Sequence, residues 1–511
     1  MSSLIKHYYI TTPLYYVNDK PHIGTAYSTI MADIFNRYHR LFGEETFFMT
    51  GTDEHGQKCQ QAAEKKGEKP LVHCDNMVQN FKSTWKSLEI EYDFFFRTTD
   101  SFHEKAVQSV LAELWEKGDI YPDTYKGWYC VSEEIFYTEK ELVNGKSPNG
   151  KEVQQIAEKN YFFKMSKYQQ ALIDHIEKNK NFIQPESRKN EVLGFLRQPL
   201  NDLCISRPKH RLSWGIEIPF DTKYVTYVWF DALLNYTTGV GLYQDKRKSN
   251  FDKWWVKTGA VHLLGKDIIT THAVYWPTML MAMGLPLPKT IFAHGWILNK
   301  KSTKMSKSAG DVVNPLDMKD LVGVDAFRYF LARDIHFGND APFSQELIIN
   351  RVNTDLANNL GNLLSRSANL ISKYFDGKAP AGGASDALTN RVIEVAKGTA
   401  KKVKADIEYM APSYALEHVI VLLNEANRFL EEKTPWKLAK KDTIAAGQSL
   451  YTAIECLRIT AILLSPVMPL KMTNLLERLG GAKADFALAK EWGVIPQGAQ
   501  ILKGESLFPR I

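Results

Sequence analysis

Residues 6–25 read KHYYITTPLYYVNDKPHIGT and contain the turn that decides the fold. The first part, Lys6–Thr12, is rich in tyrosine and isoleucine and predicts a buried β-strand. A helical pattern over Ile23–Phe42 follows, and its start at PHIGT (residues 21–25) puts a histidine and a glycine beside the first turn. Such a helix start favours phosphate, because its free N–H groups and its dipole attract anions. Alone, one histidine and one glycine in a turn are too common to establish a site.

Strand-like and helical segments alternate through the first half of the chain. The further strand candidates are Glu45–Thr50, Val225–Phe230, Ala260–Leu264 and Thr290–His294, and a helical pattern covers Ile268–Met283. This alternation predicts an α/β fold with a doubly wound, Rossmann-like parallel sheet. Sheets of this kind bind their ligands at the carboxyl ends of the strands.

The second half of the chain is helical. Its candidate helices are Gln345–Phe375, Ala387–Tyr409, Ser413–Glu432, Ala445–Leu464 and Met468–Leu479, with a Pro/Gly/Ser-rich linker at Gly377–Ser385. A loop-rich stretch with Asn-Gly turns interrupts the first half. We therefore predict a sheet domain in two parts (residues 1–117 and 220–349), an insertion (118–219) and an all-α helical bundle (350–511).

The composition is that of a folded protein with several domains: 511 residues, 44% hydrophobic and 24% charged. It excludes a disordered, collagen-like or disulfide-stapled chain. The net charge of +6 permits a polyanionic partner without requiring one. Five widely spaced cysteines predict reduced thiols. Neither an apolar run of about 18 residues nor a signal-peptide pattern is present, so we expect a cytoplasmic protein without membrane contact.

A second polar segment, KMSKS at residues 304–308, follows the last predicted strand. Its lysines, Lys304 and Lys307, can reach a triphosphate from a polar loop, although such a run is more often a solvated basic loop. The two segments stand in the right order on one strand-and-helix scaffold. Together they resemble the HIGH and KMSKS signatures of class I aminoacyl-tRNA synthetases. The first reads HIGT here, with Thr25 in place of the second histidine.

The rest of the chain resembles the methionyl-tRNA synthetase family nearly from end to end. The similar stretches are TPLYYVN (12–18), GTDEHG (51–56), YVWFDA (227–232) with Tyr236, and GKD (265–267) with His272 and Trp276. The resemblance implies that ATP is bound by His22, Gly24, Thr25, Asp267, Lys304 and Lys307, with His22, Lys304 and Lys307 catalytic. It also implies a methionine pocket made of Leu14, Tyr16, Asp53, Trp229, Ala232, Tyr236, His272 and Trp276.

These residue types suit the implied amino acid. The polarisable sulfur of methionine gains about 0.3–1.5 kcal/mol from an aromatic neighbour, and several of the implied pocket residues are aromatic. Asp53, in a polar loop after a strand, can pair with the ammonium group of the substrate. Each aromatic residue alone would be interpreted as part of the core, and its position beside the two signatures favours a pocket.

In the helical half, Asn358, Asn362 and Arg366 are spaced four residues apart and share one helix face. Asparagine and arginine can read base edges, and an exposed tryptophan such as Trp436 can stack on a base. A purely structural arrangement would give the same pattern: a polar, solvated helix face and a Pro-Trp pair packed into the core of the bundle. The resemblance favours anticodon binding, because Asn362, Arg366, Pro435 and Trp436 match the anticodon-reading positions of the family.

The resemblance implies a reaction in two steps. The carboxylate of L-methionine attacks the α-phosphate of ATP-Mg²⁺, and the methionyl group then passes to the 3′ end of tRNA(Met). No protein nucleophile is needed, because alignment and charge stabilisation lower the barrier. Three alternatives stay open: a class I synthetase for isoleucine, valine or leucine, whose insertion is normally a large editing domain; a cofactor adenylyltransferase, which is far shorter; and a non-catalytic tRNA-binding paralogue.

Two features that some relatives carry are not expected here. A zinc knuckle needs four ligands, and the matching positions hold Cys130, Glu133, Ser147 and Gly150. A lone thiol cannot form a tetrahedral zinc site, so we predict no structural zinc. The sequence also ends at Ile511 without the dimerising domain that some members append, which favours a monomer.

The zinc prediction can be checked directly. Metal analysis of protein purified without a histidine tag should find well below one zinc per chain, because two ligands do not bind zinc tightly enough to support a fold. A chelator should leave the melting temperature unchanged when Mg²⁺ is held constant. One tightly bound zinc per chain would contradict the prediction.

Overall fold

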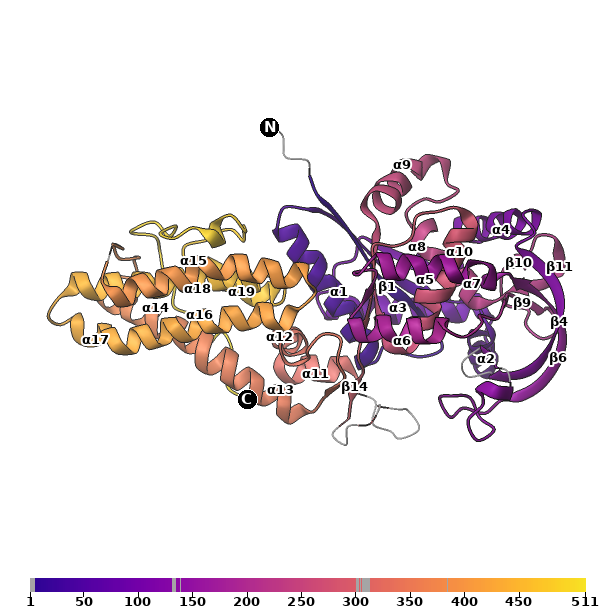
Figure 1. Ribbon diagram of the computed structural model, residues 1–511. Coiled ribbons are helices and arrows are strands. Elements are labelled where there is room, and N and C mark those ends of the chain that lie inside the picture. The colour runs from indigo at the N-terminus through magenta and orange to yellow at the C-terminus, as the bar shows by residue number, and fades with distance from the viewer. Residues whose placement is uncertain are drawn as a thin grey trace.

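A six-stranded parallel sheet forms the centre of the first half of the chain (Figure 1). The computed structural model describes residues 5–130, 135–137, 139–299, 303, 305, 313–383 and 385–511. The strand order is β3 (Phe94–Arg97), β2 (Glu45–Asp53), β1 (His7–Tyr16), β12 (Ala260–Gly265), β13 (Thr290–His294) and β7 (Ile183–Gln184). The chain order reverses between β1 and β12. This is the topological switch point, where parallel sheets bind ligands.

The sheet is covered on both faces, as a doubly wound fold requires. Along β1, Tyr8 and Ile10 join one hydrophobic core and Tyr9 joins another, because successive side chains point to opposite faces. The predicted fold class is thereby confirmed. The helices of this half are α1 (Ile23–Leu41), α2 (Gln57–Lys66), α3 (Pro70–Ser87), α4 (Ser101–Glu116), α5 (Gln169–Lys178), α6 (Glu186–Leu196), α7 (Val228–Leu233), α8 (Asn235–Thr238), α9 (Lys248–Phe251), α10 (Trp276–Met283), α11 (Pro315–Val322) and α12 (Val324–Asp334).

One predicted strand is wrong. The segment Val225–Phe230 was expected to cross the main sheet, but β11 (Asp221–Thr226) ends inside it and Val228–Leu233 form α7. A short apolar run fits a buried strand and a buried helix equally well, because too few residues are present for the periodicity to decide. The other predicted strands of this half are confirmed, and the helical pattern over Ile268–Met283 is a π-helical stretch, Thr271–Tyr275, followed by α10.

The middle of the chain adds smaller sheets. One has the order β5 (Ile135–Tyr137), β4 (Ile120–Cys130), β6 (Gln154–Phe163) and β8 (Leu203–Cys204), and another has β10 (Glu217–Ile218), β11 and β9 (Ser206–Pro208). A short pair joins β14 (Ile297–Leu298) to β15 (Ala341–Pro342). Strand β7 belongs to the predicted insertion, yet it pairs with the edge of the main sheet, with Ile183 opposite Ile291. The insertion is therefore tied to the sheet by a strand.

The candidate zinc positions are used differently. Cys130 is buried at the end of β4, and the Ser147 hydroxyl accepts a hydrogen bond from the N–H of Lys151 at 3.1 Å. Gly150 has a φ of +74°, and Glu133 lies outside the described residues. In the part of the chain that the structure describes, no three histidine, cysteine, aspartate or glutamate side chains are grouped as a metal site needs. The absence of structural zinc stays a prediction.

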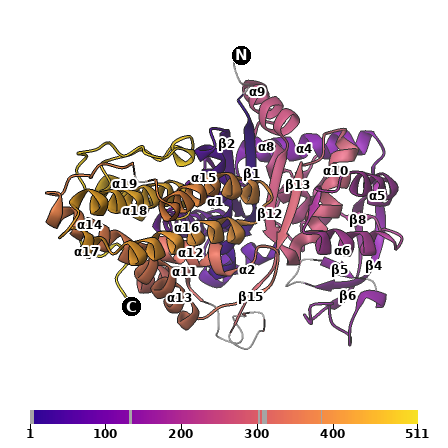
Figure 2. The same ribbon diagram turned by 60° about the vertical axis from the view of Figure 1, so that its left-hand side comes forward.

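The second half is a helical bundle to one side of the sheet (Figures 1 and 2). The predicted helices are confirmed, with their ends shifted by one or two residues. Helix α13 (Gln345–Arg351) runs through a π-helical stretch, Val352–Gly361, into α14 (Asn362–Tyr374). The others are α15 (Ala387–Glu408), α16 (Pro412–Lys433), α17 (Pro435–Leu438), α18 (Thr443–Leu464) and α19 (Pro469–Arg478). Among the described helices, none combines the length and apolar character needed to cross a bilayer.

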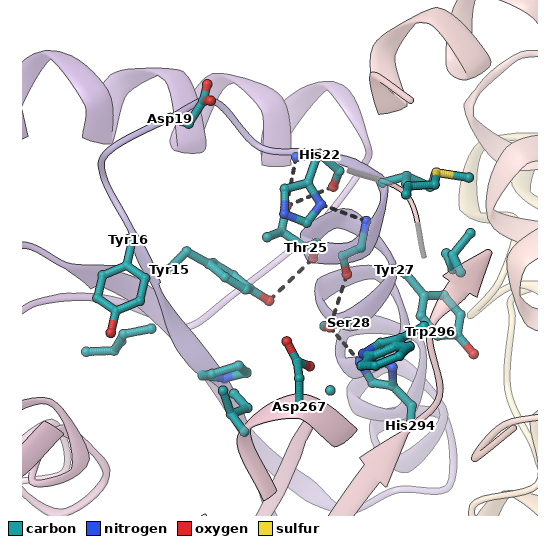
Figure 3. A pocket seen from close by; sticks show the side chains of 18 of the residues that line it. Tyr15, Tyr16, Asp19, His22, Thr25, Tyr27, Ser28, Asp267, His294 and Trp296 are labelled. Carbon is teal, nitrogen blue, oxygen red and sulfur yellow. Dashed lines mark hydrogen bonds between the residues drawn. The ribbon is translucent and has the colours of Figure 1, made fainter. Parts of the chain in front are cut away.

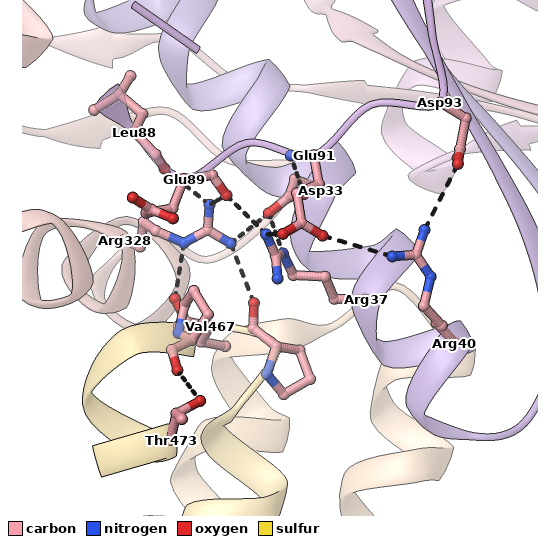
Figure 4. Close-up of polar contacts among 12 residues, drawn as sticks. Asp33, Arg37, Arg40, Leu88, Glu89, Glu91, Asp93, Arg328, Val467 and Thr473 are labelled. Atoms are coloured by element: carbon pink, nitrogen blue, oxygen red, sulfur yellow. Dashed lines mark hydrogen bonds and ion pairs between the residues drawn. The ribbon is translucent and has the colours of Figure 1, made fainter. Parts of the chain in front are cut away.

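A buried arginine of the sheet domain, Arg328, joins the two halves (Figure 4). The guanidinium of Arg328 on α12 donates to Asp33 on α1 at 2.5 Å, and both side chains are fully buried. Arg328 also donates to the carbonyls of Pro466 and Val467, between α18 and α19. Two further carbonyls after α3, those of Leu88 and Glu89, accept from the same group. One side chain thus satisfies polar groups from the sheet domain and from the bundle.

We expect Arg328→Ala to lower the free energy of unfolding by about 3–5 kcal/mol, because buried Asp33 would lose one of its two arginine partners and four backbone carbonyls would lose their donor. Urea unfolding at pH 7 measures this loss. Arg37→Ala is the matched control: Arg37 also binds Asp33, at 2.8 Å, but it reaches solvent and should cost less. A loss below about 1 kcal/mol for Arg328→Ala would contradict the assignment.

Candidate active site

A cavity of about 480 Å³ lies at the switch point of the sheet, where β1, β12 and β13 end (Figure 3). The predicted site residues that line it are Leu14, Tyr16, His22, Gly24, Thr25, Trp229 and Asp267. The remaining predicted methionine residues do not line this cavity and are buried: Asp53, Ala232, Tyr236, His272 and Trp276. The first signature and the GKD stretch, far apart in sequence, therefore meet at one cavity.

The start of α1 is closed by its own first residues. His22 is the N-cap, and its Nδ1 accepts from the N–H of Gly24 at 3.1 Å. A Cβ added at Gly24 would lie 3.0 Å from the His22 ring, so glycine leaves room for the imidazole over the first turn. The histidine ring is therefore held beside the helix N-terminus, where an anion is favoured.

Thr25 completes this turn in a way that the sequence reasoning missed. Its hydroxyl accepts from the N–H of His22 at 3.0 Å and donates to the carbonyl of His22 at 2.8 Å (Figure 3). Together with the His22–Gly24 bond, this makes a capping box. The sequence signal for this role was the position of Thr25 three residues after His22, because a capping box joins the N-cap residue to the third residue of the helix. Phosphate contact by Thr25 stays a prediction beside this structural role.

His294, at the end of β13, is a lining residue that the sequence reasoning also missed. Its Nδ1–H donates to the carbonyl of Gly295 at 2.8 Å, so its Nε2 accepts from the Ser28 hydroxyl at 2.7 Å. Burial lowers the pKa of His294 below its ordinary value. A histidine at the carboxyl end of a predicted strand was the available signal.

Apart from Asp53, the buried predicted residues form a neutral, largely aromatic group. The Tyr236 hydroxyl donates to Nε2 of His272 at 2.8 Å, because Nδ1–H of His272 donates to the carbonyl of Ile268 at 2.9 Å. Burial lowers the pKa of His272 to about 4. The ring of Trp229 lies edge-on to His272 and to Tyr16, with centroid distances of 6.0 and 6.3 Å. The group is uncharged near neutral pH and suits an apolar side chain.

Trp276 ties this group to the sheet. Its Nε1–H donates to Nε2 of His262 at 3.2 Å, and Nδ1 of His262 lies 2.7 Å from the Thr11 hydroxyl. His262 is on β12 and Thr11 is on β1, so the tie crosses the switch point. The ring of Tyr236 lies 4.1 Å from that of His262.

The second signature is only partly described. Met305 lines the cavity, which places this part of KMSKS at the predicted site. Lys304 and Lys307 lie outside the described residues.

On the helical bundle, the predicted base-reading residues come together. The guanidinium of Arg366 lies 5.2 Å from the centroid of the Trp436 ring. Asn358 and Asn362 are exposed on the same side, and Pro435 is buried at the start of α17. The Asn358 amide oxygen accepts from Nε of Arg510 at 2.7 Å. That neighbour was not anticipated, because Arg510 is more than 150 residues away in the chain.

Comparison with known families matches both halves. A model described as "tRNA synthetases class I (M)" matches residues 8–157 and 139–368, and one described as "Anticodon binding domain of methionyl tRNA ligase" matches residues 379–511. The chain belongs to the methionyl-tRNA synthetase family. The resemblance seen in the sequence is confirmed, and the chain is a class I aminoacyl-tRNA ligase.

Relatives in this family align over nearly the whole chain. The methionine–tRNA ligase of Caldanaerobacter subterraneus is 45% identical over 99% of this chain and 79% of its own length. That of Clostridium perfringens is 46% identical over 99% and 78%. The Mycobacterium tuberculosis methionyl-tRNA synthetase in complex with methionyl-adenylate has a TM-score of 0.94 at 39% identity, covering 99% of this chain and 100% of that one.

The neutral histidines predict how stability depends on pH. In the unfolded chain a histidine binds a proton near pH 6.5, whereas His272 in the folded protein binds one only near pH 4. The unfolded state therefore binds more protons in this window, so the free energy of unfolding should fall as the pH falls from about 6.5 to about 4. His272→Gln should remove about 2–3 kcal/mol of this dependence.

Urea unfolding of the wild type and of His272→Gln, compared at several pH values between 7.5 and 4.5, measures this difference. His262 and His294 also have lowered pKa values, so some dependence should persist in the variant. If the variant lost stability as steeply as the wild type, His272 would not be neutral in the folded protein.

Proposed function

We propose that the chain activates L-methionine with ATP-Mg²⁺ to methionyl-adenylate at the cavity of the switch point, and then transfers the methionyl group to the 3′ end of tRNA(Met). The observation that carries this proposal is the meeting of the capped His22 turn, Asp267 and Trp229 around one cavity. The turn suits phosphate, and the aromatic wall suits a thioether.

For ATP we assign the residues implied by the two signatures: His22, Gly24, Thr25, Asp267, Lys304 and Lys307. The His22 imidazole lies at the N-terminus of α1, where the helix dipole favours anions and where it can donate to the α-phosphate as negative charge develops. Lys304 and Lys307 stabilise the same charge from the KMSKS loop. Catalysis then rests on the alignment of the substrates and on fixed positive charge and hydrogen-bond donors, with no covalent enzyme intermediate.

For methionine we assign the pocket Leu14, Tyr16, Asp53, Trp229, Ala232, Tyr236, His272 and Trp276. The carboxylate of Asp53 pairs with the substrate ammonium group. Neutral His272, fixed by Tyr236 and Ile268, closes the apolar end without adding charge. An apolar thioether would gain nothing from an imidazolium there, so the lowered pKa of His272 fits this assignment.

For the anticodon we assign Asn358, Asn362, Arg366, Pro435 and Trp436. The Arg366 guanidinium lies over the Trp436 ring, so an arginine and an indole present a joint platform for base stacking and base-edge contact. A monomeric, cytoplasmic enzyme without structural zinc, and the domain boundaries at residues 117, 219 and 349, also stay predictions.

The functions proposed for the two halves can be tested by two substitutions, one in each half. Trp436→Ala should lower kcat/KM for tRNA by about 5- to 150-fold, the equivalent of about 1–3 kcal/mol of base stacking, and leave methionine-dependent pyrophosphate exchange unchanged. Trp229→Ala should raise the KM for methionine in pyrophosphate exchange and leave the KM for tRNA unchanged.

The exchange assay is run with each of the twenty amino acids, and methionine should far exceed leucine and isoleucine. Equal activity with isoleucine would contradict the substrate assignment. A comparable loss in both assays from Trp436→Ala would mean that this residue supports the fold and does not contact the anticodon.

A further inference from the structure

Two of the sequence motifs, GTDEHG (51–56) and YVWFDA (227–232), are joined by a buried hydrogen bond. Nδ1–H of His55 donates to Oδ2 of Asp231 at 3.0 Å. Asp231 is fully buried and His55 is 4% exposed. The family resemblance assigned no role to either residue. Each one, however, is two positions from a proposed methionine-binding residue, Asp53 in the first motif and Trp229 in the second.

The end of β2 is anchored to the neighbouring strand β3. The buried carboxylate of Glu54 accepts from Nε and Nη2 of Arg97 at 2.7 and 2.9 Å. It also accepts from the hydroxyls of Thr52 and Thr99, at 2.7 and 2.5 Å. Arg97 is the last residue of β3, so the neighbouring strand fixes the segment between Asp53 and His55. His55 therefore starts from a well-anchored backbone.

A second contact fixes the loop around His55. The indole N–H of Trp214 donates to the carbonyl of Glu54 at 2.6 Å, and the carbonyl of Trp214 accepts from the N–H of Gly56 at 3.2 Å. The ring of Trp214 lies 5.4 Å from that of His55. The His55 imidazole is thus packed beside the Trp214 indole, and its Nδ1–H points at Asp231.

Helix α7 carries Trp229 and Asp231. Few interactions within the helix itself fix its position. It spans only Val228–Leu233, and its N-cap, Tyr227, makes no side-chain capping bond. A helix of this length is not stable by itself, so tertiary contacts must set its orientation. Residues two apart on a helix point about 200° apart, so Asp231 can bond to the β2 loop while Trp229 faces the cavity.

Charge strengthens the link between the two residues. Burial alone would lower the pKa of His55, but the facing carboxylate of Asp231 raises it above the ordinary value. Glu104, on α4, lies 3.8 Å from Nε2 of His55 and acts in the same direction. Among the described residues, Oδ1 of Asp231 has no hydrogen-bond partner, so its pairing with His55 is the main compensation for burying the carboxylate.

We propose that His55 and Asp231 are positioning residues for amino-acid recognition: their hydrogen bond fixes α7 against the end of β2 and so sets the Trp229 indole relative to Asp53. This inference rests on the proposed methionine pocket. Neither residue touches the substrate. Each acts indirectly, by setting the distance between Trp229 on α7 and Asp53 at the end of β2, which bind the methionine side chain and its ammonium group in the proposed pocket.

The test uses the full-length enzyme and pyrophosphate exchange, with active sites counted by the burst of adenylate formation. Asp231→Ala should raise the KM for methionine by about 5- to 50-fold, because small misplacements of a binding wall are costly, while the KM for ATP changes less than about twofold. His55→Gln should do the same. Asp231→Asn, which keeps the shape and one acceptor oxygen, should recover part of the loss.

Asp231→Asn carries the test if Asp231→Ala fails to fold. The double variant His55→Gln/Asp231→Asn should raise the KM no more than the worse single change, because the two residues act through one bond. The matched control is His39→Gln. His39 forms a similar, largely buried pair with Glu44, at 2.7 Å, at the other end of α1, and its loss should leave the methionine KM unchanged.

The outcomes separate this inference from the proposed pocket. If Trp229→Ala leaves the methionine KM unchanged, the pocket assignment is wrong. If Trp229→Ala raises the KM but Asp231→Asn and His55→Gln lower only the melting temperature or the number of active sites, the pocket stands and the pair is merely structural. A similar rise in His39→Gln would show that any buried histidine pair has this effect and would also overturn the inference.

Discussion

The relation between the two halves depends on Arg328, which pairs with Asp33 in the sheet domain and with backbone carbonyls of the bundle. Asp33 lies in the middle of α1, the helix whose first turn holds His22. Arg328 binds the carbonyls that close the bundle between α18 and α19. A buried guanidinium is tolerated only when its donors are satisfied, so these segments must keep their relative positions. The orientation of α1 is therefore fixed from the bundle side as well as from the sheet.

A second constraint is the absence of charge on the buried histidines at and behind the cavity. His262, His272 and His294 are buried with lowered pKa values, and the carbonyls of Ile268 and Gly295 fix the tautomers of the last two. A histidine with a raised pKa, His55, instead faces the carboxylate of Asp231. In the proposed pocket, recognition would rest on shape and on one ammonium–carboxylate pair, with the phosphate chemistry at the start of α1.

The sequence could predict the parallel sheet, most strands and the helical bundle, because strand–helix alternation and long helical periods are local signals. It could not separate strand from helix in Val225–Phe230, where a short apolar run fits both. Motif resemblance brought His22, Trp229 and Asp267 to one cavity correctly. The bonds of His294 with Ser28 and of Arg510 with Asn358 were missed, because a hydrogen-bond partner distant in sequence leaves no local pattern. The bonds of Thr25 to His22 are local, but a histidine followed by a threonine is not the usual Ser/Thr and Glu/Gln pattern of a capping box.

The capping box at Thr25 bears on how the HIGT turn can change during evolution. The threonine hydroxyl joins the N–H and the carbonyl of His22, so the helix start is stabilised from within the turn. Replacing threonine by histidine, which restores the HIGH spelling, would remove that hydroxyl and cost about 0.5–2 kcal/mol of helix-start stability. The threonine form of the turn therefore carries a stability advantage of its own, which a change to histidine would have to offset elsewhere in the protein.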